Sequence, residues 1–200
     1  MRTILDPRKA DAAAVRATVA LVASISPADL DRPTPCADWD LRALLAHMTA
    51  QHRGFAAAAV GRGADEAVWR PDPQDPISRY APSAADVITA FAPHDVLDRP
   101  FLLPEVGDRP LPGRMVIGFH LVDFVVHGWD VAAAMGLPWE LPADVLEAAL
   151  PIARAVPDGE ERKLPGAAFA PAIHTSAEPT PMTEILTLLG RSQDWRPNLS

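Results

Sequence analysis

The stretch that decides the fold of this chain is residues 120–130, HLVDFVVHGWD. It holds three potential metal ligands, His120, Asp123 and His127, at spacings of three and four residues. Because each residue of an α-helix turns the chain by about 100°, these side chains fall on one helical face. The residues between them are too apolar for a solvated surface. Buried imidazoles and a carboxylate need partners, since desolvating them unpaired costs several kcal/mol, and a divalent metal would satisfy all three.

The composition is that of an ordinary globular protein, with 48% hydrophobic and 22% charged residues in a chain of 200. The net charge of −8 and the lack of a basic stripe argue against a nucleic-acid partner. Cys36 is the only cysteine, so no intrachain disulfide can form, which favours a cytoplasmic location. The uncharged run 17–28 is too short to cross a bilayer, and acidic residues precede it. We expect no membrane contact and a monomer or homodimer that binds small molecules.

The 22 prolines divide the chain into helices and connections, because proline is poorly tolerated inside a helix. The intervals between proline clusters carry apolar residues at helical spacing. Asp40 is the expected N-cap of the second helix, and Ser83 with Asp86 that of the third. The segment 100–112 predicts an extended excursion with a short hairpin. The predicted helices are 6–26, 40–60, a third beginning at Ser83, 113–135, 142–155 and 181–189.

Six helices with little strand predict a mainly α fold, a four-helix bundle with long connections. We expect the bundle to occupy residues 1–140. Residues 141–200 are expected to form a C-terminal helical extension packed on the same domain. Gly136 followed by Pro138 marks the end of the fourth helix.

His47 lies at the margin of the apolar stripe of the second helix and is expected to face the bundle interior or its rim. Bundles build metal sites from side chains on facing helices, so His47 could meet Asp123 and His127. Two imidazoles and one carboxylate suit Zn²⁺, Fe²⁺ or Ni²⁺, and three protein ligands leave a position open for water or substrate. The alternative is that these groups are hydrogen-bonded members of the core.

Other polar residues allow more than one interpretation. His120 either orients a ligand or binds substrate, or it faces solvent at a helix end. Asp130 either orients a ligand histidine or has a structural role, as a cap or as the partner of Arg42 or Arg114. Cys36 precedes the second helix, whose N-terminus lowers the pKa of a thiol, but packing is the commoner role for a cysteine in such a position.

Two more expectations follow from spacing and position. His52 comes five residues after His47, so it should point to a different face of the second helix and be exposed. Glu105 and Arg191 are candidates for the mouth of a pocket, although nothing in the sequence requires it.

Two separated motifs resemble the mycothiol-dependent maleylpyruvate isomerase family. Residues 34–41, TPCADWDL, followed by LLAH at 44–47, are similar to the family's TPC-x-x-W-x-V-x-x-L-x-x-H signature. Residues 127–132, HGWDVA, are similar to its H-G-W-D-L-A segment. Segments 169–173 and 189–195 resemble the closing segments of a short actinobacterial subgroup. The resemblance therefore covers most of the chain.

The resemblance implies a metal-binding bundle of the DinB-like superfamily, of the up-down-down-up type. It implies that His47, Asp123 and His127 are the metal ligands, and it makes His120 a neighbour of the site rather than a ligand. The characterised isomerase has glutamate at the middle position. The shorter Asp123 would bring the metal closer to the fourth helix or leave room for a water.

We therefore expect a metal-dependent enzyme that uses a low-molecular-weight thiol, mycothiol, to transfer or isomerise a small electrophilic substrate. Zinc is the expected metal, with nickel or iron as alternatives. The competing hypothesis is a non-catalytic metal- or small-molecule-binding protein. It is favoured by Asp123 and by the two short helices where the isomerase has a separate domain. A third hypothesis is a structural bundle whose histidines are only hydrogen-bonded.

Overall fold

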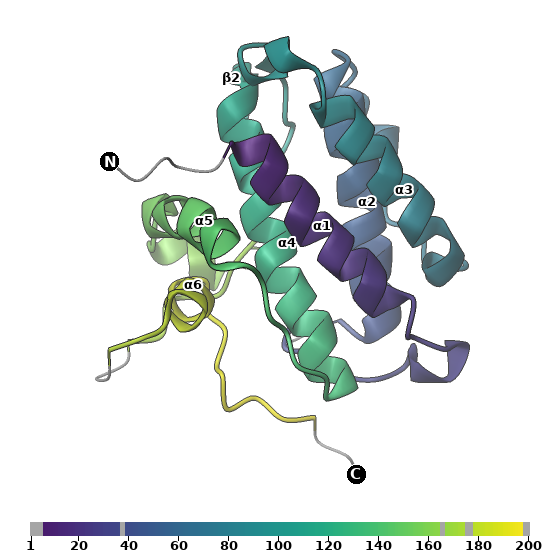
Figure 1. Ribbon diagram of the computed structural model, residues 1–200, viewed down its shortest axis with the longest axis vertical. Coiled ribbons are helices and arrows are strands. Elements are labelled where there is room, and N and C mark those ends of the chain that lie inside the picture. Colours follow the sequence, from purple (N-terminus) through teal and green to yellow (C-terminus); the bar gives the residue numbers. More distant parts are fainter. Residues whose placement is uncertain (1–5, 37–38, 165–166, 175–177, 198–200) are drawn as a thin grey trace.

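The computed structural model describes residues 6–36, 39–164, 167–174 and 178–197. Four long helices pack side by side in it (Figure 1). They are α1 (Pro7–Val22), α2 (Leu41–Ala59), α3 (Pro76–Phe91) and α4 (Gly113–Met135). The mainly helical bundle predicted from the proline pattern is thus confirmed.

Helix α4 is the central helix of the fold, and its predicted bounds, 113–135, are confirmed. It ends at Gly136, whose φ of 67° is a left-handed conformation that glycine adopts without strain. By length and composition α4 could cross a membrane, yet 78% of its most apolar window is buried inside the protein. A helix that is apolar on all sides belongs in a core.

The boundaries of α2 and of the hairpin also match the prediction. The Asp40 side chain accepts a hydrogen bond from the backbone N–H of Ala43 at 2.8 Å, which caps α2. Strands β1 (Pro100–Phe101) and β2 (Leu111–Pro112) form the short antiparallel hairpin, with Phe101 opposite Leu111.

The predicted start of the third helix is wrong. Helix α3 begins at Pro76, where proline at the first helical position costs no hydrogen bond, and it continues through Pro82. Ser83 does not cap it, because its hydroxyl donates to the carbonyl of Tyr80 at 2.8 Å. Tyr80 is fully buried, and packing of this first half of α3 outweighs the helix-breaking tendency of Pro82.

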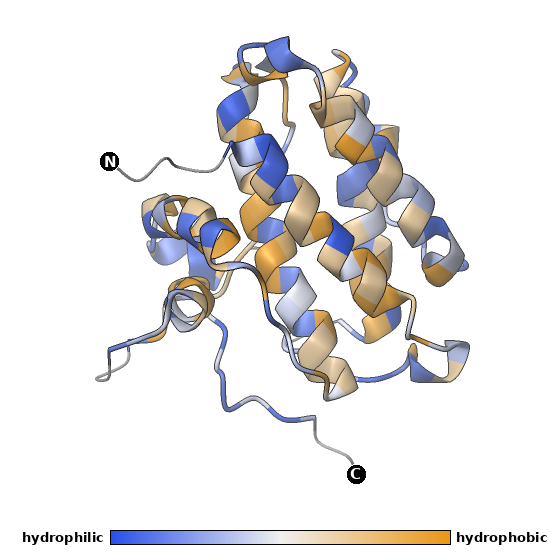
Figure 2. Cartoon of the chain, in the orientation of Figure 1, coloured by the Kyte–Doolittle hydropathy of each residue, from blue (hydrophilic) through white to orange (hydrophobic). Residues whose placement is uncertain are grey.

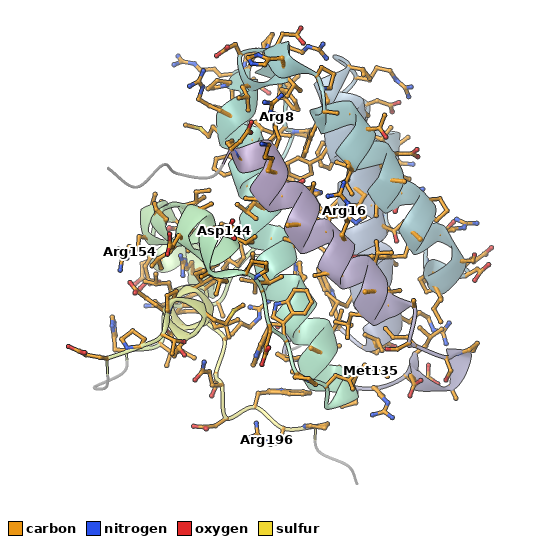
Figure 3. All side chains as sticks on the ribbon, viewed as in Figure 1. Arg8, Arg16, Met135, Asp144, Arg154 and Arg196 are labelled. Atoms are coloured by element: carbon orange, nitrogen blue, oxygen red, sulfur yellow. The ribbon has the colours of Figure 1, made fainter. Side chains whose placement is uncertain are left out.

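The C-terminal segment packs against the outside of α1 and α4 (Figure 1). Helices α5 (Ala143–Ala155) and α6 (Pro181–Leu188) bury apolar residues in one cluster with α4. Arg154, labelled in Figure 3, joins α5 to Glu184 of α6 through two hydrogen bonds. The segment that follows α6 is mostly hydrophilic (Figure 2).

Candidate metal centre

Three of the predicted site residues meet between α2 and α4. One possible ligand atom from each of His47, Asp123 and His127 lies within 4.8 Å of the others. The Nε2 atom of His127 is 3.3 Å from Oδ1 of Asp123, and the ring centroids of His47 and His127 are 5.1 Å apart. The fold therefore brings these residues together as expected. That they bind a metal stays a prediction.

The chemistry of this group fits a divalent cation. Oδ2 of Asp123 is buried and has no hydrogen-bond partner among the described residues. Leaving a buried carboxylate oxygen unpaired costs free energy, which a cation would offset. Two imidazoles and a carboxylate are ligands that zinc, iron and nickel accept. The Asp123 side chain is 19% exposed, so the site is not sealed in the core.

Burial and neighbouring charges shift the pKa values of the two histidines in opposite directions. Burial, together with repulsion from His127, lowers the pKa of His47 to about 4, so this imidazole is neutral at pH 7. Burial opposes the charge of His127, but attraction to Asp123 and hydrogen bonds outweigh it and raise the pKa of His127 well above its ordinary value. Burial likewise opposes ionisation of Asp123, but His127 lowers the pKa of that carboxyl to about 2.

The other ring nitrogen of His127 faces a second polar cluster. Nδ1 of His127 lies 3.0 Å from Oδ2 of Asp130. The guanidinium of Arg191 donates from Nε to Oδ1 of Asp130 at 2.9 Å and from Nη2 to Oδ2 at 3.0 Å. The Cys36 thiol donates to the same Oδ2 at 3.3 Å, and its sulfur accepts from Nη2 of Arg191 at 2.8 Å.

This second cluster is a poorer place for a cation, although Cys36, His127 and Asp130 also lie close enough to share one. The Arg191 guanidinium already binds both Asp130 and Cys36, and a metal there would meet its positive charge. The Nε2 side of His127 is therefore the better candidate for a metal position.

Arg191, predicted only as a candidate for a pocket mouth, is buried and paired with Asp130. It follows α6, and Gly190 before it adopts φ 76°, the left-handed turn that ends the helix. The structural alternative for Asp130, pairing with Arg42 or Arg114, is wrong, since Arg191 takes that place. Arg42 and Arg114 pair with Asp31 and Asp98.

His120 lies in a separate buried chain of polar groups. Its Nδ1 is 2.6 Å from Oδ1 of Asp11 on α1, and its Nε2 is 3.2 Å from Nδ1 of His52 on α2. All three side chains are fully buried, so the prediction that His52 is exposed is wrong, and His120 does not face solvent. The His52 ring also stacks on Phe124, with centroids 4.1 Å apart. A role of His120 in orienting ligands or contacting substrate stays a prediction.

Residues in the two sequence motifs also have structural roles. The Thr34 hydroxyl donates to the carbonyl of Trp39 at 2.8 Å, which folds the loop before α2 and supports the Trp39 ring 4.6 Å from that of His47. Residues 37–38 of this motif lie outside the described residues. A Cβ at Gly128 would lie 2.2 Å from the ring of Trp139, so only glycine leaves room for that indole.

Comparisons with known proteins match most of this chain. Residues 12–132 match the family model described as the mycothiol maleylpyruvate isomerase N-terminal domain. Uncharacterised proteins from two strains of Mycobacterium tuberculosis are 30% identical over 189 residues, which is 94% of this chain and 99% of theirs.

Solved structures extend the comparison to the fold. The chain is similar to the crystal structure of the mycothiol-dependent maleylpyruvate isomerase, with a TM-score of 0.52 at 14% identity. It is also similar to a histidine-to-alanine mutant of that enzyme, with a TM-score of 0.55 at 12% identity. Each match covers 74% of this chain and 68% of the other. At such identities the likeness shows the fold, and it confirms the predicted DinB-like bundle.

Proposed function

Because this chain belongs to the mycothiol maleylpyruvate isomerase N-terminal domain family, we propose that it is a metal-dependent enzyme that uses mycothiol. Its reaction would transfer or isomerise a small electrophilic substrate. The observation that carries the proposal is the convergence of His47, Asp123 and His127, with Oδ2 of Asp123 buried and lacking a partner in the described part of the chain.

These three residues would hold the cation, with zinc as the expected ion and nickel or iron as alternatives. When bound, a divalent cation lowers the pKa of a thiol beside it, so that the thiol reacts as a thiolate at neutral pH. The protein prepares this position before any cation arrives. His47 is neutral at pH 7 and offers its lone pair without losing a proton, because burial has already lowered its pKa to about 4.

The surroundings of Asp123 supply polar groups for a small substrate. The Glu105 carboxyl has a pKa raised by burial and by the charge of Asp123, and it shares a hydrogen bond with Gln51. A carboxyl group close to Asp123 could exchange a proton with a substrate bound there. The Trp39 ring packs against that of His47, with the two centroids 4.6 Å apart.

The remaining expectations belong to the same proposal. The protein would act in the cytoplasm, as a monomer or homodimer. Residues 1–140 would provide the metal-binding bundle, and residues 141–200 would form an extension that packs on it. The apolar cluster shared by α4, α5 and α6 supports the packing of the extension on the bundle.

The experiment that tests the proposal is calorimetric titration of mycothiol into zinc-loaded protein, in two buffers of different ionisation enthalpy at pH 7. We expect binding with release of about one proton per thiol, since a thiol whose ordinary pKa is about 8.5 would be bound as a thiolate. Chelator-treated protein and the Asp123→Asn variant should not bind. His94→Asn, at an exposed histidine outside the group, is the matched control and should behave as the wild type. Zinc-loaded protein that never binds mycothiol would favour the non-catalytic binding protein instead.

A further inference from the structure

Among the described residues of the C-terminal extension, Arg191 is the one whose hydrogen bonds reach the candidate metal centre. Arg191 contacts Asp130, and Asp130 contacts Nδ1 of His127. We propose that Arg191 is a positioning residue of the metal centre, an inference that rests on the proposed function. It would fix Asp130 so that His127 presents Nε2 to the cation. The matched family segment ends at residue 132, so this contribution comes from outside it.

The contact between Arg191 and Asp130 is a bidentate ion pair. Two guanidinium nitrogens of Arg191 bind the two carboxylate oxygens of Asp130, at 2.9 and 3.0 Å. Such a bidentate pair sets orientation as well as charge. Arg191 is 5% exposed and Asp130 is fully buried, so water does not compete for either group.

The backbone around Arg191 directs this side chain toward Asp130. Gly190 turns with φ 76°, and a Cβ there would lie 2.6 Å from the carbonyl oxygen of Ala170. The backbone N–H of Arg191 then bonds the carbonyl of Leu186 at 2.8 Å. The segment beyond α6 is mostly hydrophilic (Figure 2), and of its described residues Arg191 is the one that hydrogen-bonds a buried carboxylate.

A second buried arginine shows what a purely structural role looks like in the same extension. Arg162 is 6% exposed and donates to four backbone carbonyls of the extension. Those hydrogen bonds connect parts of the extension to one another. The main partner of Arg191 is instead a carboxylate that contacts a candidate ligand. Arg162 is therefore a matched control for Arg191.

The consequence for His127 follows from imidazole chemistry. When His127 gives up one proton to bind a cation, its neutral imidazole keeps a single N–H. A carboxylate at Nδ1 holds that proton there and leaves the Nε2 lone pair free. Nε2 is the atom that faces Asp123, at 3.3 Å. Partners of this kind typically change metal affinity by about 10- to 100-fold when they are mutated.

The test compares Arg191→Met and Arg191→Gln with Arg162→Met. Two quantities are measured: the zinc dissociation constant, by competition with a chromophoric chelator, and the Nδ1–H proton signal of His127 by NMR in metal-free protein. We expect both Arg191 variants to bind zinc about tenfold more weakly, and the Nδ1–H signal to shift and exchange faster. Arg191→Lys should recover part of both effects. Arg162→Met should lower the unfolding temperature but leave both measurements as in the wild type.

Two outcomes separate this proposal from the proposed function. If both Arg191 variants keep the wild-type zinc affinity and the wild-type signal, the positioning role is overturned whatever the protein catalyses. If the wild type binds no zinc, the proposed function fails, and the NMR signal still decides whether Arg191 positions His127. Should Arg191→Met not fold, Arg191→Gln, which keeps hydrogen-bonding capacity, gives the same comparison.

Discussion

The buried imidazole of His47 makes the metal-free protein sensitive to acid. Its pKa falls from 6.5 in the unfolded chain to about 4 in the folded protein. The unfolded state therefore takes up a proton first, and stability present at pH 7 is lost as the pH falls through 6.5 toward 4. The pKa difference of about 2.5 between the two states, at about 1.4 kcal/mol for each pKa unit, corresponds to about 3 kcal/mol of stability. About 2 kcal/mol of this is lost between pH 7 and pH 5, where an unfolded imidazole is already mostly protonated.

The assay is urea unfolding followed by circular dichroism, with chelator present, at pH 7, 6 and 5. His47→Gln keeps a neutral polar side chain that does not titrate, so its loss of stability over this range should be about 2 kcal/mol smaller than that of the wild type. His52, whose pKa burial also lowers, contributes to both proteins and cancels in the difference. His94→Gln is the control for substitution alone. Equal losses in the wild type and His47→Gln would refute the burial of a neutral imidazole at this position.

Three further predictions concern the same bundle. Zinc binding at pH 7 should release about one proton, from His127, because attraction to Asp123 raises the pKa of that imidazole against the effect of burial; calorimetry in two buffers measures it, and affinity should weaken as the pH falls. Asp11→Ala removes the partner of the buried His120 and should lower the free energy of unfolding by about 3 kcal/mol, measured in urea. Gly128→Ala places a methyl group against Trp139 and should cost about 1 to 3 kcal/mol, with a changed tryptophan emission spectrum.

The parts of the fold that the sequence predicted are those set by local chemistry. Helix α4 was placed correctly because its apolar run ends at Gly136, which adopts the left-handed conformation that stops a helix. Asp40 was recognised because an N-cap needs only its own side chain and the next turn. The predicted start of helix α3 lies too far along the chain because burial of Tyr80, a tertiary effect, overrides the local signal of Pro82.

In the candidate site, too, contacts between residues close in sequence were easier to predict than contacts between residues far apart in it. Asp123 and His127 are one helical turn apart, so their meeting is a local property. The apolar stripe of the second helix indicated that His47 could join them, and the resemblance implied the same. A helical wheel placed His52 away from His47 but could not show that neighbouring helices cover that face as well. Arg191 lies 61 residues from its partner carboxylate in sequence, with no periodicity to relate the two. Only the fold could reveal that contact.

The claim that His47, Asp123 and His127 form a metal centre is tested most directly by elemental analysis of the protein as purified. We predict about one divalent ion per chain in the wild type, as expected for a single three-ligand site. The double variant His47→Ala with His127→Ala should contain none. The double variant His94→Ala with His174→Ala, at two exposed histidines, should keep the full content. A wild type without metal, or a His47→Ala and His127→Ala protein that keeps its metal, would contradict the account.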